Sequence, residues 1–181
     1  MPTPRVTPLP REEWDAEVTE LLDATQMGGQ VLNIFKTLAR HPKLLKRWLV
    51  FGNHVLFKST IGARERELLI LRTGWNCRAE YEWGQHVVIG KQVGLSDDEI
   101  RRITAGPDAP GWDAFDVTLL RAADELHRQQ RIADATWAAL AARYDTQQML
   151  DVVFTVGQYT LVSMALNSLG VPLDDGIPGF P

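Results

Sequence analysis

Apolar residues along the 181-residue chain recur mostly at spacings of three and four, and no stretch alternates with a sustained period of two. A spacing of three to four gathers side chains on one face of an α-helix, whereas a strand needs alternation. The pattern therefore predicts an all-α protein, a helical bundle. We expect helices at about 11–23, 31–40, 42–57, 63–78, 79–93, 96–104, 113–129, 134–144 and 147–169.

The helix that begins at Pro42 illustrates the expected core, because its apolar residues share one face. We expect it to bury Leu44, Trp48, Phe51 and Val55. Proline suits the first position of a helix, where its missing N–H costs nothing.

A loop rich in glycine and proline, "GPDAPG" at 106–111, is the strongest candidate for a domain boundary. The two halves that it would separate are each small for an independent core. We therefore expect a single domain over 1–181, with an N-terminal arm at 1–10 and a C-terminal tail at 173–181. The "MGGQ" stretch at 27–30 is expected to break the chain between two helices.

Composition narrows the classes of partner. The net charge is −4 and no block of Lys or Arg is present, which disfavours nucleic acid and anionic membranes as partners. The single cysteine, Cys77, excludes an intramolecular disulfide and a CxxC couple, and it suits the cytoplasm. The N-terminal stretch lacks the apolar core of a signal peptide. Polar residues interrupt the apolar run 149–170, which favours a buried helix over a membrane span.

The candidate chemistry lies in "CRAEYEWGQH", residues 77–86. On a helical wheel, Glu82 and His86 fall inside the apolar stripe, one turn apart and within reach of each other. Glu67 occupies the same kind of position on the preceding helix. A carboxylate on an apolar face is costly unless it is paired. If the two helices pack antiparallel, the three side chains converge on one polar pocket.

Other interpretations remain open for these residues. Buried Glu and His also form purely structural pairs, for which Arg72 and Arg78 are available. One Glu and one His are too few ligands for a metal site, so we expect neither a metal nor another cofactor.

The segment "RERELLILRTGWNCRAEYEWGQHVVIGKQVGLSDDEI" resembles the central signature of the carboxymuconolactone decarboxylase family, within the alkylhydroperoxidase-D-like superfamily. The redox branch of that superfamily carries a Glu, eleven residues, CxxC, three residues and a His. Alignment on His86 places Glu67 at the upstream Glu but Ala79 and Glu82 at the two cysteines. Cys77 is two residues too early. The resemblance therefore favours the decarboxylase-like branch, which lacks the dithiol.

This resemblance implies an all-α homo-oligomer, commonly a dimer, trimer or hexamer, with a buried acid/base site completed at subunit contacts. The decarboxylase for which the family is named acts on a small carboxylated lactone. We accordingly expect a carboxy-lyase-like enzyme that needs no cofactor and acts on a small organic acid. A binding or assembly protein without catalysis is the alternative, and redox chemistry at Cys77 is a third.

The expected roles follow from side-chain chemistry. His86 would carry the proton, since its ordinary pKa lies near the working pH. Glu82 would orient His86, and Glu67 would be a second carboxyl in the site. Three further residues are candidates for substrate binding: Tyr81 as a donor, Trp83 as a wall and Arg72 as the cation that stabilises an enolate.

Overall fold

The structure, a computed structural model, describes residues 3–26 and 28–181, so Met27 of the predicted break and the first two residues of the predicted arm lie outside it. Over the described ranges the protein is helical and has no β-strand, which confirms the all-α prediction. A short 3₁₀ helix, η1 (Arg11–Glu13), precedes α1 (Ala16–Asp23), α2 (Asn33–Leu38), α3 (Pro42–Phe57), α4 (Ala63–Asn76), α5 (Glu80–Gln92), α6 (Asp97–Ala105), α7 (Ala114–Gln129), α8 (Asp134–Ala141) and α9 (Thr146–Leu169).

Capping residues explain several of the helix boundaries. Asp15 accepts a hydrogen bond from the backbone N–H of Val18, so α1 begins at Ala16 and the predicted helix 11–23 is divided. Ser96 and Glu99 form a reciprocal capping box at the start of α6. Gly170 ends α9 with a φ of 65°, a left-handed conformation that costs glycine little.

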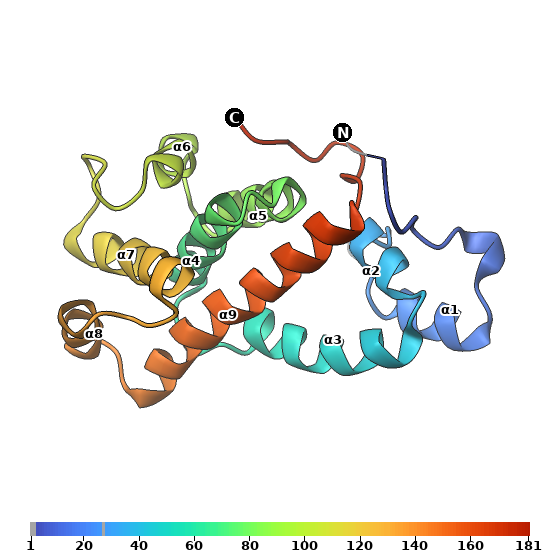
Figure 1. Cartoon of the computed structure of the whole chain (residues 1–181), viewed down its shortest axis with the longest axis horizontal. Helices are drawn as coiled ribbons and strands as arrows, with labels where there is room; N and C mark the ends of the chain where they lie inside the picture. The colour runs from blue at the N-terminus through green and yellow to red at the C-terminus, as the bar shows by residue number, and fades with distance from the viewer. Residues whose placement is uncertain (1–2, 27) are drawn as a thin grey trace.

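The centre of the fold is α4, whose residues Leu68–Leu71 are fully buried. Helices α5, α7 and α9 pack around it, and α9 crosses the molecule diagonally (Figure 1). On the other side of α9, helices α1 to α3 enclose a smaller cluster around Leu22 and Leu45. The space between α2, α3, α5 and α9 is where the cavity described below lies.

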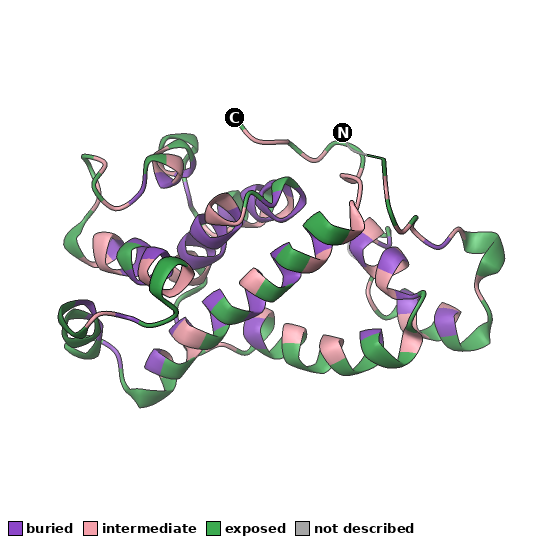
Figure 2. Ribbon diagram, in the orientation of Figure 1, coloured by how far each residue is buried: buried purple, intermediate pink, exposed green. Residues whose placement is uncertain are grey.

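The face that α3 buries differs from the predicted one. Val55 is buried and Trp48 is partly buried, but 51% of Leu44 and 38% of Phe51 are exposed, and Leu45 is buried instead. The reason is that α3 contacts α1, α2 and α9 from one side only, and its other side meets no neighbouring helix within the described chain (Figure 2). Helical periodicity alone does not show how narrow the buried face of α3 is.

Helix α9 is long and apolar enough to cross a membrane by length and composition, a test that core helices of soluble proteins also pass. Half of its most apolar window is buried within the fold, against α4 and α3 among others. The exposed residues lie along one side of the helix (Figure 2).

The C-terminal tail runs back along α5 after Gly170 and is ordered against it. A Cβ atom on Gly84 would lie 2.2 Å from the carbonyl oxygen of Pro178, so only glycine allows the tail to approach so closely. Phe180 stacks edge-on against Trp75, with the ring centroids 5.2 Å apart. The tail thereby becomes one wall of the cavity.

Candidate functional site

The site is built on the hairpin formed by α4 and α5. Arg78 turns the chain with a φ of 52°, and α5 then runs back along α4 in the opposite direction. A Cβ on Gly74 would lie 3.5 Å from the backbone nitrogen of Trp83, so the two backbones are close where α5 begins. This antiparallel packing brings Glu67 on α4 opposite His86 on α5.

The three predicted residues meet in a chain of charges. Nδ1 of His86 lies 2.6 Å from Oε2 of Glu67, and Nε2 lies 3.0 Å from Oε1 of Glu82. Arg66 donates to the other oxygen of Glu67, at 3.0 Å from Nη2. Glu67, Glu82 and His86 are each buried. Two anions therefore alternate with two cations, provided that His86 is protonated.

The protonation state of His86 follows from this geometry. An ionised carboxylate can only accept hydrogen bonds, so a ring with a carboxylate at each nitrogen needs both N–H groups. Burial by itself lowers the pKa of His86, but the charges of Glu67 and Glu82 and hydrogen bonding to them outweigh burial and raise the pKa to about 10. His86 is thus an imidazolium at neutral pH, and the expectation of a pKa near the working pH is not met.

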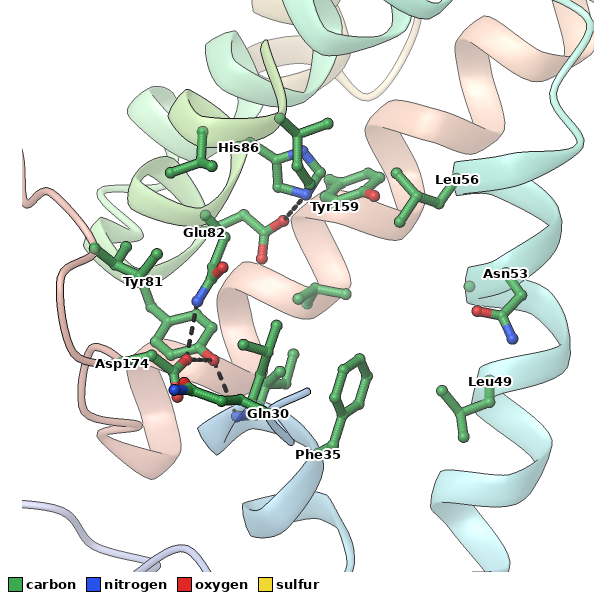
Figure 3. A pocket seen from close by; sticks show the side chains of 18 of the residues that line it. Gln30, Phe35, Leu49, Asn53, Leu56, Tyr81, Glu82, His86, Tyr159 and Asp174 are labelled. Atoms are coloured by element: carbon green, nitrogen blue, oxygen red, sulfur yellow. Dashed lines mark hydrogen bonds and ion pairs between the residues drawn. The ribbon is translucent and has the colours of Figure 1, made fainter. Parts of the chain in front are cut away.

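A cavity of about 540 Å³ opens beside this charged chain, a size typical of sites for small molecules. Glu82 and His86 line it, whereas Glu67 lies behind them and does not. Figure 3 shows Glu82, His86 and Tyr159 on one wall and the side chains of Leu49, Asn53 and Leu56 from α3 opposite. Eight further lining residues are aliphatic or aromatic: Leu32, Ile34, Phe35, Trp48, Val88, Ile89, Val162 and Ile177.

The sequence reasoning missed several polar side chains of the cavity, among them those of Tyr159, Gln158 and Trp48. The ring of Tyr159 meets that of His86 edge-on at 4.9 Å, and burial raises the pKa of its hydroxyl well above the ordinary value, so it stays a neutral donor. Gln158 is 5% exposed and reaches toward Gly52 on α3. The indole nitrogen of Trp48 is buried without a hydrogen-bond partner. The signal for two of them was polarity within the apolar run of α9, where Gln158 and Tyr159 are neighbours.

Tyr81, one of the predicted substrate-binding residues, does line the cavity. Its hydroxyl donates to Asp174 in the tail and accepts from the backbone N–H of Ile34 at 3.1 Å. Burial and the neighbouring charge of Asp174 raise the pKa of this hydroxyl. Tyr81 therefore fastens the tail and α2 to α5, and its hydroxyl is already occupied (Figure 3).

The structure does not bring Trp83 and Arg72 to the cavity. Trp83 points into the main core, where it packs against Trp75 and Phe180. Arg72 forms a buried pair with Asp124 on α7, with Nε 2.6 Å from Oδ1, and it also donates to the carbonyl of Ile103. The guanidinium binds groups of α6 and α7, because the side of α4 that carries Arg72 faces these helices.

Cys77 also lies away from the cavity, at the end of α4. Its sulfur is 3.7 Å from Nδ1 of His127. Burial raises the pKa of the thiol, which lowers its thiolate fraction at neutral pH. Among residues 3–26 and 28–181, no group of three or more His, Cys, Asp or Glu has an arrangement that could hold a metal ion. The polar atoms at the cavity are instead arranged as an acid–imidazolium pair with free donors beside it.

The all-α bundle has a fold of the alkylhydroperoxidase-D-like type. The family model described as "Carboxymuconolactone decarboxylase family" matches residues 42–125, which contain Glu67, Glu82 and His86. The predicted resemblance to that family is therefore confirmed.

Solved structures agree with this assignment of the fold. An uncharacterized peroxidase-related protein from Ralstonia eutropha JMP134, an alkylhydroperoxidase AhpD core, is 18% identical with a TM-score of 0.82, covering 97% of this chain and 94% of its own. A peroxidase-related protein from Silicibacter sp. TM1040 is 16% identical with a TM-score of 0.80, covering 98% and 92%. The debrominase Bmp8 in complex with 2,3,4-tribromopyrrole is 12% identical with a TM-score of 0.73, covering 94% and 91%. At these identities the likeness shows the fold alone. No curated protein matches the sequence significantly.

Proposed function

We propose that the protein is a cofactor-free enzyme that moves a proton to and from a small organic molecule in the cavity, and that Glu82 carries the proton. The observation that supports this proposal is the Glu82–His86 pair, which faces an open cavity and is held from behind by Glu67 and Arg66. Glu82 is the carboxylate of the charged chain that lines the cavity. We thus assign to Glu82 the proton-transfer role that the sequence suggested for His86.

The proposed step is proton removal next to a carbonyl group. A C–H proton passes to Glu82, and the electron pair of that bond moves to the carbonyl oxygen, which becomes an enolate. The hydroxyl of Tyr159 or the amide of Gln158 donates a hydrogen bond to that oxygen. His86 stays an imidazolium, orients Glu82 and offsets its charge. Return of the proton to the same carbon completes a proton exchange, and its delivery to another carbon of the delocalised enolate completes an isomerisation.

The same site suits the final step of a decarboxylation. When a C–C bond breaks and CO2 leaves, the electron pair of that bond forms an enolate. The carbon then takes up a proton from water, which Glu82 relays to it. The match to the decarboxylase family and the structural similarity to the debrominase Bmp8 support a catalytic role. That the reaction is a decarboxylation is a more specific proposal. Dithiol peroxidase chemistry is not part of it, because a relay needs two thiols and the chain has one cysteine.

A binding or assembly protein without catalysis is the competing function. In such a protein the Glu82–His86 pair would serve only to join α4 to α5, and core side chains could fill the space beside it. The cavity of about 540 Å³ beside the pair favours the enzyme.

Proton exchange offers a test that does not require the natural substrate. Enolisable lactones and ketones would be incubated with the protein in D2O, and loss of the α-proton signal followed by NMR; β-keto acids would be followed by release of CO2. We expect exchange to fall at least about 100-fold in Glu82→Gln, because removing a positioned acid or base costs that much. Cys77→Ser is the matched control and should exchange at the wild-type rate.

Two results would count against the enzyme. Wild-type exchange in Glu82→Gln would remove Glu82 from the chemistry. If the whole panel stayed inert in the wild type as well, while the Glu82 variant merely lost stability, the assembly protein would be the better account.

We also propose that two or more copies of the chain associate through α9. Its exposed apolar side carries Leu150, Phe154, Gly157, Leu161 and Met164, which alternate at spacings of four and three. This is the spacing of a helix–helix seam, and a Cβ on Gly157 would meet nothing within 4 Å. Such an arrangement suits an identical helix about a twofold axis.

The α9 stripe lies next to the cavity along the same helix, since Gln158 and Val162 each directly follow a stripe residue. A second copy docked there would border the site. We place this assembly in the cytoplasm, a location that suits a chain with one unpaired cysteine.

A further inference from the structure

The charges at the cavity wall are unbalanced. Three carboxylates line the cavity, those of Glu82, Asp174 and Asp175, whereas His86 is the one positively charged group among the lining residues that the structure describes. Among the described residues that line the cavity, none is Lys or Arg. The nearby guanidinium of Arg66 is bound to Glu67, behind the wall. A carboxylate ligand would find three like charges and no uncommitted cation.

The single positive group is already fully engaged. Both nitrogens of His86 face carboxylate oxygens, at 2.6 and 3.0 Å. An anionic ligand would have to displace Glu82 from His86 in order to be neutralised. That exchange would leave Glu82 buried without its partner, which is strongly unfavourable.

The unused polar groups of the cavity are neutral. The amide of Gln158 lines the cavity, with its Nε2 3.6 Å from a Cβ placed on Gly52. The indole nitrogen of the neighbouring Trp48 is enclosed by protein and is not one of these groups. The hydroxyl of Tyr159 lies on the same side as His86 (Figure 3). Neutral donors in an aliphatic and aromatic cavity are suited to the carbonyl or hydroxyl oxygen of an uncharged molecule.

We propose that the cavity binds an uncharged, largely apolar ring compound that carries a carbonyl or hydroxyl group, and that it rejects carboxylate anions. This inference rests on the proposed function for the position of the reacting group. It replaces the small organic acid expected from the sequence, and it selects proton transfer on a neutral carbonyl compound over decarboxylation, which would need a bound carboxylate. The neutral donors of α9, Gln158 and Tyr159, hold the oxygen, the apolar side chains cover the ring, and the wall carboxylates repel an acid.

Binding of matched compounds tests the inference directly. Methyl benzoate and acetophenone would be compared with benzoate, which has nearly the same ring and size but carries a charge. Affinity for the full-length protein would be measured by calorimetry and by quenching of tryptophan fluorescence, at one ionic strength. We expect benzoate to bind at least tenfold more weakly than both neutral compounds. Equal or tighter binding of benzoate would overturn the inference.

A charge substitution at the cavity wall sharpens the comparison. Asp175 is exposed and has no hydrogen-bond partner in the described chain, so Asp175→Lys changes the charge without breaking a contact. We expect it to raise the affinity for benzoate and to narrow the gap to methyl benzoate. Glu17→Lys, on the exposed side of α1 and outside the cavity lining, changes the net charge equally and should leave both affinities unchanged. Equal effects of the two variants would show that net charge, and not the wall, sets the preference.

The neutral donors have a separate test. Gln158→Leu removes the amide and keeps a side chain of similar size. We expect methyl benzoate to bind about tenfold more weakly to this variant, whereas toluene, which lacks the acceptor, should bind as before. A parallel loss for both compounds would indicate a collapsed cavity and would count against the assigned role of the amide.

The binding and exchange experiments can fail independently. If the neutral compounds bind tightly but no α-proton exchange occurs, the proposed function is refuted, whereas the inference that the ligand is uncharged is not. Exchange on β-keto acids together with preferred binding of anions would refute the ligand class and leave proton transfer standing.

Discussion

At the scale of single residues, the behaviour of His86 depends on two acids that belong to different helices. Glu82 is one turn away on α5, and Glu67 comes from α4, so neither element alone creates the imidazolium. The spacing of Glu82 and His86 was visible in the sequence. The contact of the ring with two carboxylates, which raises its pKa, was not visible there, because it requires the packing of α4 on α5.

The raised pKa of His86 predicts how stability depends on pH. Because the folded pKa is about 10 against an ordinary 6.5, the contribution of protonated His86 is complete below about pH 6.5 and is lost as pH rises toward 10. Urea unfolding of the wild type and of His86→Gln would be compared at pH 6, 7.5 and 9. We expect the advantage of the wild type to shrink steadily with rising pH.

The same experiment can contradict the assignment. A wild-type advantage that grows or stays constant between pH 6.5 and 9 would show that the ring is not held as an imidazolium. Ring resonances of His86 that titrate near 6.5 in NMR spectra would lead to the same conclusion.

At the scale of elements, the tail and α5 depend on each other through one glycine. Gly84 is buried under the tail, and its missing Cβ is what allows Pro178 to lie there. The tail in turn brings Asp174 and Ile177 to the cavity. A helical wheel places a residue on a face, but it does not show that a distant segment will cover that face.

Gly84→Ala should therefore displace the tail. The added Cβ would lie 2.2 Å from the carbonyl oxygen of Pro178, a backbone atom that can move only with the tail. We expect a loss of about 1–3 kcal/mol in the free energy of unfolding and faster hydrogen exchange in residues 173–181. Gly52→Ala is the control, since its Cβ would meet neighbours at an ordinary 3.6 Å. Unchanged exchange in the tail of Gly84→Ala would contradict this account.

At the scale of the whole molecule, the exposed apolar residues gather on α3 and α9. Phe51 on α3 and Phe154 on α9 contact each other edge-on at 6.0 Å, and both remain partly exposed. An apolar surface that runs along two helices is typical of an interaction site. The association proposed above would cover part of this surface.

Leu161→Asp should weaken the proposed association. A charge in the middle of the α9 stripe would be buried without a partner in the assembly, while in the single chain it faces solvent. We expect the molar mass in solution, measured by light scattering after gel filtration, to fall toward 20.3 kDa without a loss of helicity. Trp137→Glu replaces an exposed aromatic residue on α8 and should leave the mass unchanged. A wild type that is already monomeric at high concentration would refute the proposed interface.

The sequence by itself determined the all-α fold, the approximate ends of its helices and the placement of Glu67, Glu82 and His86 on buried faces. These features follow from helical periodicity and from capping residues, which act over a few neighbouring positions. Only the tertiary structure decided which neighbour each face meets. It turned Arg72 toward Asp124 and Trp83 into the core, and it brought Trp48, Gln158 and Tyr159 to the cavity from two distant helices. The physical reason is that a helix fixes the direction of its own side chains, whereas a cavity is defined by the several helices that surround it.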